Sequence, residues 1–228
     1  MLFLLKIYLM TTSEENYIKV IYHLSLVSPT GVNTNAIAGM LNTKASSVTE
    51  MLKKLSDKDL LIYQKYQGVN LTENGLLCAK MIVRKHRLWE VFLVEKLNFS
   101  WDEVHEIAEE LEHIKSEKLI NKLDEFLDFP AFDPHGDPIP DENGAIKKVE
   151  KLLLSEAKLN IEYQCVGVKD TSVSFLQYLD KQQISLGSKM KILSKEDFDA
   201  SQTIQLGEKI LVISNKIAEN IFIKIQAK

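Results

Sequence analysis

Apolar residues recur every three to four positions through most of the chain up to about residue 127. This spacing places them on one face of a helix and therefore predicts amphipathic helices. We expect helices at Ser13–Leu26, Thr34–Leu41, Lys44–Lys58, Glu73–Lys96, Trp101–Ile114 and Glu117–Leu127. Ser13 is the expected N-cap of the first helix, with Glu14 and Glu15 in its first turn.

The last third of the chain has a different pattern. From about residue 148, short apolar runs alternate with glycine and asparagine, as in strands separated by turns. The predicted strands are Asn160–Val168, Lys189–Ser194, Lys209–Ile213 and Asn220–Ile225. Short strands in so small a segment favour a compact barrel like an SH3 domain. The preceding segment, Pro130–Pro140, contains too many prolines to continue as a helix.

The second and third predicted helices are joined by a tight turn, which is the arrangement of a helix-turn-helix. Leu60–Lys65 and Val69–Leu71 then alternate around Gln67-Gly68 and predict a hairpin, which completes a winged helix-turn-helix. In such a unit the second helix of the motif enters the major groove of DNA. The polar candidates for DNA contact are Thr34, Lys44, Ser46, Ser47, Thr49, Glu50, Lys53 and Lys54. A helix face of this composition is usually only solvated, but the ordered set of elements favours DNA binding.

Histidines and acids gather between residues 86 and 113. His86 and Glu90 stand one turn apart within an apolar stripe, where an unpaired charge would be costly. Along the edge of the next predicted helix, one polar row contains His105, Glu109, Glu112 and His113. Imidazole and carboxylate donors without a thiolate suit Mn²⁺ or Fe²⁺, and Zn²⁺ or Co²⁺ could substitute. The alternative is an internal network of His–Glu ion pairs.

The charge of the chain is consistent with a cation site in its middle. The net charge is −4, which argues against a non-specific nucleic-acid binder, and the excess of acid falls between residues 76 and 150. A solvated acidic helix face would explain the charge equally well. Cys78 and Cys165 lack metal-type spacing and are expected to be buried and reduced, as in a cytoplasmic protein.

Other segments exclude several classes of protein. The apolar stretch before Met10 is about half the length that spans a bilayer, and Met10 looks like the natural start, so no membrane association is expected. The chain contains no glycine-rich phosphate loop and no His-Glu-x-x-His run, and no histidine follows His135. We therefore expect no enzymatic activity, and a zinc hydrolase fits poorly.

Several motifs together resemble the diphtheria-toxin-repressor and manganese-transport-regulator family of metal-dependent repressors. They are Thr12-Ser-Glu-Glu-Asn-Tyr-Ile-Lys-Val-Ile-Tyr22, Ala45-Ser-Ser-Val-Thr-Glu-Met51, Leu71-Thr-Glu-Asn-Gly75, Lys85-His-Arg-Leu-Trp-Glu90, Glu109-Glu-Leu-Glu-His113 and Asp133-Pro-His-Gly-Asp-Pro-Ile-Pro140. The resemblance implies a winged helix-turn-helix domain over residues 1–73 and a helical metal-binding and dimerisation domain over 74–147. It also implies an SH3-like, FeoA-like β-barrel over 148–228, giving a mainly α protein with a small β component.

The resemblance further implies two metal sites per subunit. Glu109, Glu112 and His113 match the primary effector site, and His86, Glu90 and His105 match the ancillary site, although in manganese-type members the His86 position serves a binuclear centre. The ligand on the first helix, which is Met or Asp in the family, corresponds to Asn16, whose amide oxygen is an uncharged donor. Glu109 replaces the Cys of iron-type members and favours manganese-type chemistry. The family's third-domain ligands fall on Thr171 and Ser174, and that contribution is not carried over.

The sequence therefore predicts a homodimeric DNA-binding regulator that depends on Mn²⁺ or Fe²⁺ and represses metal-uptake genes at a double-stranded operator. One alternative is a winged-helix regulator with a degenerate, metal-blind site. Another is a metal-binding or hydrolytic protein whose winged helix serves protein contacts.

Overall fold

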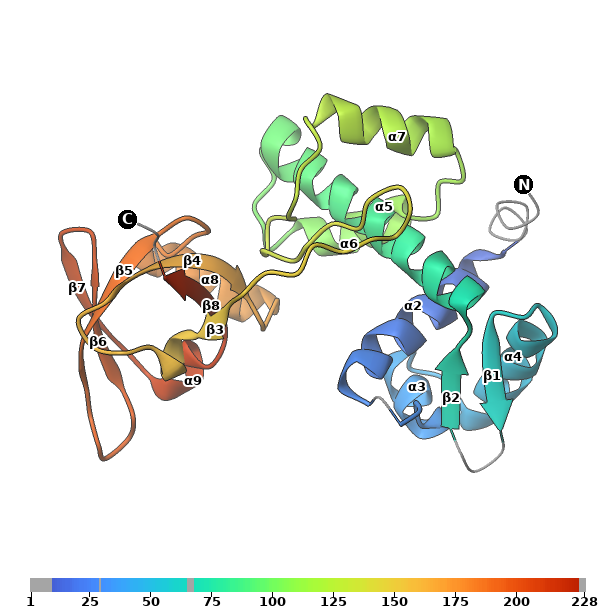
Figure 1. Cartoon of the computed structure of the whole chain (residues 1–228), viewed down its shortest axis with the longest axis horizontal. Helices are drawn as coiled ribbons and strands as arrows, with labels where there is room; N and C mark the ends of the chain where they lie inside the picture. The colour runs from blue at the N-terminus through green and yellow to red at the C-terminus, as the bar shows by residue number, and fades with distance from the viewer. Residues whose placement is uncertain (1–9, 29, 65–67, 226–228) are drawn as a thin grey trace. The chain divides into compact units, whose positions relative to one another are not determined.

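The computed structural model describes residues 10–28, 30–64 and 68–225, which belong to two compact units (Figure 1). The first unit contains Met1–Trp89, Glu109–Glu125 and Pro140–Ile146, and the second contains Glu90–Ala108, Phe126–Ile139 and Lys147–Lys228. The helical middle segment thus contributes to both units. The expectation about the segment before Met10 lies outside the described residues. Within the described ranges, no helix combines the length and apolar character needed to cross a membrane.

The first unit contains the predicted winged helix-turn-helix. Its elements are α2 (Thr12–Val27), α3 (Thr34–Met40), α4 (Ala45–Asp57), strands β1 (Leu61–Gln64) and β2 (Gly68–Leu71), and the start of α5 (Glu73–Leu97). Their apolar faces meet in one core, in which Ile18, Leu52 and Ile82 are fully buried. Burial of these faces is the main force that holds short helices together.

The start of α2 differs from the prediction. Thr11, and not Ser13, is the N-cap, because the Thr11 hydroxyl accepts from the Glu14 backbone N–H and the Glu14 carboxylate accepts from the Thr11 N–H. This reciprocal capping box stabilises the earlier start.

The hairpin is antiparallel, with Leu61 opposite Leu71 and Gln64 opposite Gly68; its predicted turn lies outside the described residues. It packs tightly against the first turn of α5. A Cβ on Gly75 would lie 1.8 Å from the Leu60 carbonyl oxygen, so only glycine fits there.

The helices after α5 are shorter than predicted. Helix α6 spans Val104–Leu111 and α7 spans Glu117–Phe126. Glu112 and His113 therefore lie in the turn just beyond α6 and not on the helix itself. Arg84 of α5 joins Asp124 of α7 through an ion pair of 2.6 Å.

The second unit contains a six-stranded sheet in the order β3-β8-β4-β5-β6-β7, with antiparallel pairing throughout. The strands are β3 (Leu152–Leu153), β4 (Glu162–Val168), β5 (Lys189–Lys195), β6 (Gln202–Leu206), β7 (Lys209–Ile213) and β8 (Ile221–Ile225). The prediction of a small antiparallel β domain is confirmed. A closed barrel is not shown, because β3 and β7 are the two edges of the sheet in the described part of the chain.

Two elements of this unit were not predicted as such. Helix α8 (Val173–Gln182) buries Phe175, Leu176 and Leu179 at helical spacing, and strand β6 alternates between buried and exposed side chains. Both elements are short, and their apolar patterns are weaker than those of the neighbouring strands, so the sequence did not predict them. The remaining short elements are α9 (Asn215–Ala218) and a 3-10 turn at Leu154–Glu156.

Candidate functional site

Glu112 lies at the centre of a polar cluster inside the first unit. Its carboxylate is completely shielded from solvent. His86 Nδ1, from α5, lies 2.7 Å from Glu112 Oε2. Lys19 Nζ, from α2, lies 2.7 Å from both Glu112 oxygens. Three helical segments that are distant in sequence therefore meet at one carboxylate.

Glu109 completes this cluster from the last turn of α6. Its Oε1 lies 2.5 Å from Lys19 Nζ and 3.8 Å from His86 Nδ1. One donor atom from each of His86, Glu109 and Glu112 lies within 4.8 Å of the other two, close enough to share one metal ion. Burial raises the pKa of Glu112, but the His86 hydrogen bond and the Lys19 charge outweigh burial and hold this pKa below its ordinary value. The carboxylate is thus kept in the anionic form that a cation requires.

The N-terminal turn of α2 supplies further donors in the same unit. His113 Nδ1 lies 2.5 Å from Glu15 Oε2, and Lys85 Nζ lies 4.0 Å from Glu15 Oε1. Among the described residues, Glu15 Oε1 and Asn16 Oδ1 are buried without a hydrogen bond. Buried polar oxygens normally have a partner, so these two are suited to an additional ligand. The set of carboxylate, imidazole and amide oxygen donors, without thiolate, fits Mn²⁺ or Fe²⁺.

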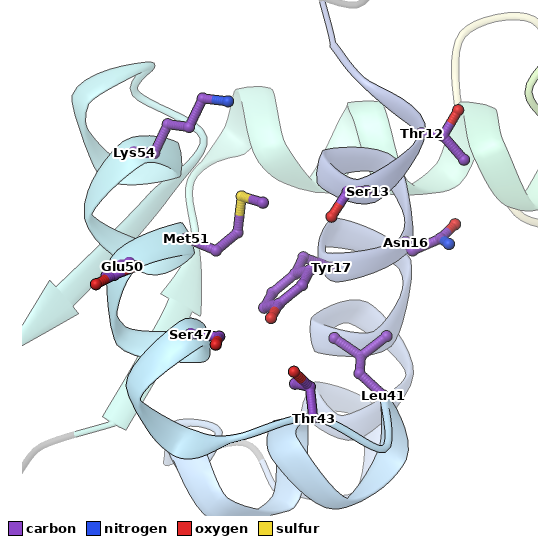
Figure 2. Close-up of a pocket in the computed structure, with 10 residues that line it drawn as sticks. All are labelled: Thr12, Ser13, Asn16, Tyr17, Leu41, Thr43, Ser47, Glu50, Met51 and Lys54. Carbon is purple, nitrogen blue, oxygen red and sulfur yellow. The ribbon is translucent and has the colours of Figure 1, made fainter.

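Asn16 also lines a groove of about 830 Å³ between α2 and α4 (Figure 2). Figure 2 shows the Tyr17 ring pointing toward α4, whereas the Asn16 amide points away from α4. The two neighbours on α2 therefore point to different sides of the helix, and the Tyr17 ring lies on the side of α4.

A second cluster lies within the second unit and includes residues that the sequence-based assignment missed. Donor atoms of Glu90, Asp133 and His135 lie within 4.8 Å of one another, and all three residues are buried. The more exposed His105 has its Nδ1 3.7 Å from Glu90 Oε1. The available signal was the spacing of an acid and an imidazole two positions apart in the Asp133-Pro-His-Gly run.

The surroundings of His135 orient its ring for ligation. His135 Nε2 donates to the Trp101 carbonyl oxygen at 2.9 Å, and Nδ1 faces Glu90 Oε2 at 3.6 Å. A histidine that donates one ring N–H to a backbone carbonyl presents its other nitrogen as a metal ligand. Burial lowers the pKa of His135, but hydrogen bonding and charge from Glu90, with help from Asp133, raise it above the ordinary value.

The predicted donors His86, Glu109 and His113 lie around Glu112. His86 joins Glu109 and Glu112, while His113 is hydrogen-bonded to Glu15 and its Nε2 lies 3.9 Å from Glu112 Oε1. The opposite, solvent-facing acids Glu103, Glu106 and Glu110 are exposed, as predicted.

The predicted DNA-contacting residues lie on and around α3 and α4. Lys44, Ser46, Ser47, Glu50, Lys53 and Lys54 are exposed, and Thr34 and Thr49 are partly buried. The Thr49 hydroxyl donates to the Ala45 carbonyl oxygen, so part of its hydrogen-bonding capacity is used inside the helix. Lys54 Nζ lies 3.0 Å from Glu14 Oε1, which links α4 to the start of α2. Lys54 is thus engaged in an ion pair within the protein, whereas the exposed Ser46 and Lys53 are better candidates for contact with a phosphate or a base.

Three family models together match most of the chain. Residues 9–69 match the N-terminal DNA-binding domain of iron-dependent repressors, and residues 72–141 match the metal-binding and dimerisation domain of the same repressors. Residues 152–225 match the FeoA domain. The order of the three matches is the order of the predicted domains.

Individual relatives agree with these matches. An uncharacterized HTH-type transcriptional regulator of Methanocaldococcus jannaschii is 36% identical over 119 residues, which are 52% of this chain and 95% of the relative. The iron-dependent repressor IdeR of Mycobacterium tuberculosis is 33% identical over 128 residues, 56% of this chain and 55% of IdeR. A solved manganese-dependent transcriptional repressor in complex with manganese superposes with a TM-score of 0.79 and 30% identity, covering 93% of this chain and 100% of the other. The chain therefore belongs to the diphtheria-toxin-repressor and manganese-transport-regulator family of metal-dependent transcriptional repressors.

Proposed function

We propose that this protein is a cytoplasmic, homodimeric repressor. It binds operator DNA when loaded with Mn²⁺ or Fe²⁺ and thereby controls metal-uptake genes. The members of its family are transcriptional repressors, not enzymes. The observation that carries the proposal is the fully buried Glu112 carboxylate, which faces His86 and lies beside Glu109 within reach of α2. Buried carboxylates and imidazoles converging from separate helices are what a structural cation requires.

We assign two metal sites to each subunit. The first uses His86, Glu109 and Glu112, with His113 and Asn16 as further donors. The second uses Glu90, Asp133 and His135, with the partly exposed His105 at its edge. The assignment of the histidines and acids rests on the distances and burial described above, and Asn16 is included because its buried Oδ1 accepts no hydrogen bond from the described residues.

Helix α2 is the element through which occupancy of the first site would reach the DNA-binding surface. Lys19 and Glu15 contact the region of α6 and the turn after it, while Glu14 contacts the end of α4. A divalent cation held by these carboxylates and by an α2 donor such as Asn16 would join α2 to the turn after α6. The residues of α2 then fix the position of the reading helix, and the population shifts toward the DNA-binding arrangement because metal binds that arrangement more tightly.

The dimer follows from the match to a dimerisation domain and from the geometry of DNA reading. Helix-turn-helix proteins generally read paired half-sites with two symmetric recognition helices. We therefore expect a symmetric operator on double-stranded DNA.

The test is a gel shift on the promoter of a neighbouring metal-transport gene, performed anaerobically with and without Mn²⁺ or Fe²⁺. We expect metal-dependent binding by the wild type and by Glu110→Gln, which changes an exposed acid that directly follows Glu109 but is not a proposed ligand. Glu112→Gln and His113→Ala should lose the metal response while remaining folded dimers. Normal metal-dependent binding by Glu112→Gln would reject the assignment of the first site.

The same experiment separates the alternatives. DNA binding that ignores metal, together with no stoichiometric metal uptake in calorimetry, would indicate a metal-blind regulator. Metal uptake without a shift on any genomic fragment would instead favour a metal-binding protein whose winged helix contacts proteins.

A further inference from the structure

Lys19 is a lysine in an unusual place. Only 7% of its surface is exposed, although lysine is rarely buried unless it is paired. It lies one turn after Glu15 on α2, and its side chain reaches the two carboxylates that form the first metal site.

The Lys19 ammonium takes the position of a bound cation relative to these carboxylates. Its Nζ lies 2.5 Å from Glu109 Oε1 and 2.7 Å from both oxygens of Glu112. His86 Nδ1 also lies 2.7 Å from Oε2 of the same Glu112 carboxylate. Three carboxylate oxygens around one nitrogen leave little capacity for a divalent ion on the same atoms, and two cations at such short separation repel each other strongly.

We propose that Lys19 is a resident cation of the first metal site. In the metal-free protein its ammonium joins Glu109 and Glu112 to α2 and offsets the repulsion between the two acids. A divalent ion that binds these acids displaces the ammonium, so Lys19 competes with metal and raises the metal concentration at which the protein responds. This inference rests on the proposed metal site and adds the group that sets its affinity.

The physical reason lies in the difference between the two cations. The ammonium is tethered, singly charged and always present, whereas the metal is doubly charged and arrives from solution. Displacement by metal breaks the buried ion pairs of Lys19. The free energy lost with these pairs makes the observed binding of metal weaker than the carboxylates would show without Lys19. The alternative is a purely structural Lys19 that stays in place beside a bound ion.

The first test measures Mn²⁺ affinity by anaerobic calorimetry on the full-length protein. Lys19→Met keeps the length of the side chain but removes the competing charge, and we expect it to bind Mn²⁺ about ten-fold more tightly or better, which corresponds to about 1.4 kcal/mol. Lys19→Arg retains the charge and should stay close to the wild type. Lys58→Met is the control, because the Lys58 ammonium also pairs with a buried carboxylate of α2, that of Glu14 at 2.7 Å, which belongs to neither metal site.

Thermal unfolding without metal provides a second readout on the same variants. Lys19→Met leaves Glu109 and Glu112 facing each other without the ammonium, so its metal-free Tm should fall below that of Lys19→Arg, and saturating Mn²⁺ should restore it. If Lys19→Met does not fold without metal, Lys19→Gln replaces it in the affinity comparison, because the amide also lacks the charge but can still donate hydrogen bonds to Glu109 and Glu112.

The third readout follows Lys19 itself. Acetic anhydride labelling, quantified by mass spectrometry, should modify Lys19 slowly in the metal-free wild type and faster in saturating Mn²⁺, with the exposed Lys122 as the internal reference. Equal or slower labelling of Lys19 with metal would overturn displacement.

The outcomes separate this inference from the proposed site. If Glu112→Gln lowers the Mn²⁺ stoichiometry by one ion per subunit while Lys19→Met binds no more tightly than the wild type, the site is correct and Lys19 is not a competitor. If Glu112→Gln binds as many Mn²⁺ ions per subunit as the wild type, with unchanged affinity, the assignment of the first site is wrong and the inference about Lys19 falls with it.

Discussion

The ion pair between Arg84 and Asp124 should contribute strongly to the stability of the helical region. Arg84 is only 4% exposed, the Asp124 side chain is 16% exposed, and the Arg84 Nη2 to Asp124 Oδ2 distance is 2.6 Å. Removing one partner of a buried pair leaves the other charge uncompensated, which typically costs about 3–5 kcal/mol. Because Asp124 retains some contact with water, we expect Asp124→Ala to lower the free energy of unfolding by about 2–3 kcal/mol.

The same helix offers a matched control. Lys122 and Glu125 also form an ion pair of 2.6 Å, but their side chains are 66% and 57% exposed. Glu125→Ala should therefore cost roughly 0–1 kcal/mol. Replacing both buried partners, in Arg84→Met with Asp124→Leu, should recover most of the loss, since an apolar pair leaves no buried charge.

Urea unfolding followed by far-ultraviolet circular dichroism measures these differences, at one fixed protein concentration because a dimer's stability depends on it. The reasoning fails if Asp124→Ala and Glu125→Ala destabilise the protein equally, because burial would then not govern the strength of the pair. It also fails if the double variant is no more stable than Asp124→Ala.

Three further changes test other contacts. Glu14→Gln removes the ion pair with Lys58 at 2.7 Å, and should cost about 1 kcal/mol in urea unfolding because the lysine is partly solvated; an unchanged midpoint would show that the pair is dispensable. Gly136→Ala places a Cβ 2.0 Å from the Val166 carbonyl oxygen at a φ of +83°, and should destabilise the second unit by about 1–3 kcal/mol, seen as a lower Tm; a wild-type Tm would contradict this packing. Burial raises the pKa of the Cys165 thiol to about 11, so a thiol reagent should modify it at pH 8 only after unfolding; rapid modification of the native protein would show that it is accessible.

Much of the first unit was predictable because its signals are local. Apolar residues at helical spacing identified the helix-turn-helix, and the alternating segments around Gly68 identified the hairpin. The cap of α2 was misplaced by two residues because Thr11 and Ser13 are both good caps, and the reciprocal hydrogen bonds with Glu14 decide between them. In the second unit, α8 was missed because its ten residues carry only three buried apolar side chains.

By itself, the sequence indicated which residues have the chemistry of metal donors and which helix is expected to face DNA, because residue type and helical periodicity are local properties. Only the tertiary structure decided which donors share a cluster. Glu112 meets Lys19, 93 positions earlier, through packing of α2 beside the end of α6, and no periodicity encodes that contact. Packing likewise brings His135 to Glu90 from a proline-rich loop. The physical reason is that a buried charge is tolerated only beside its partner, and the fold, not the order of residues along the chain, places that partner.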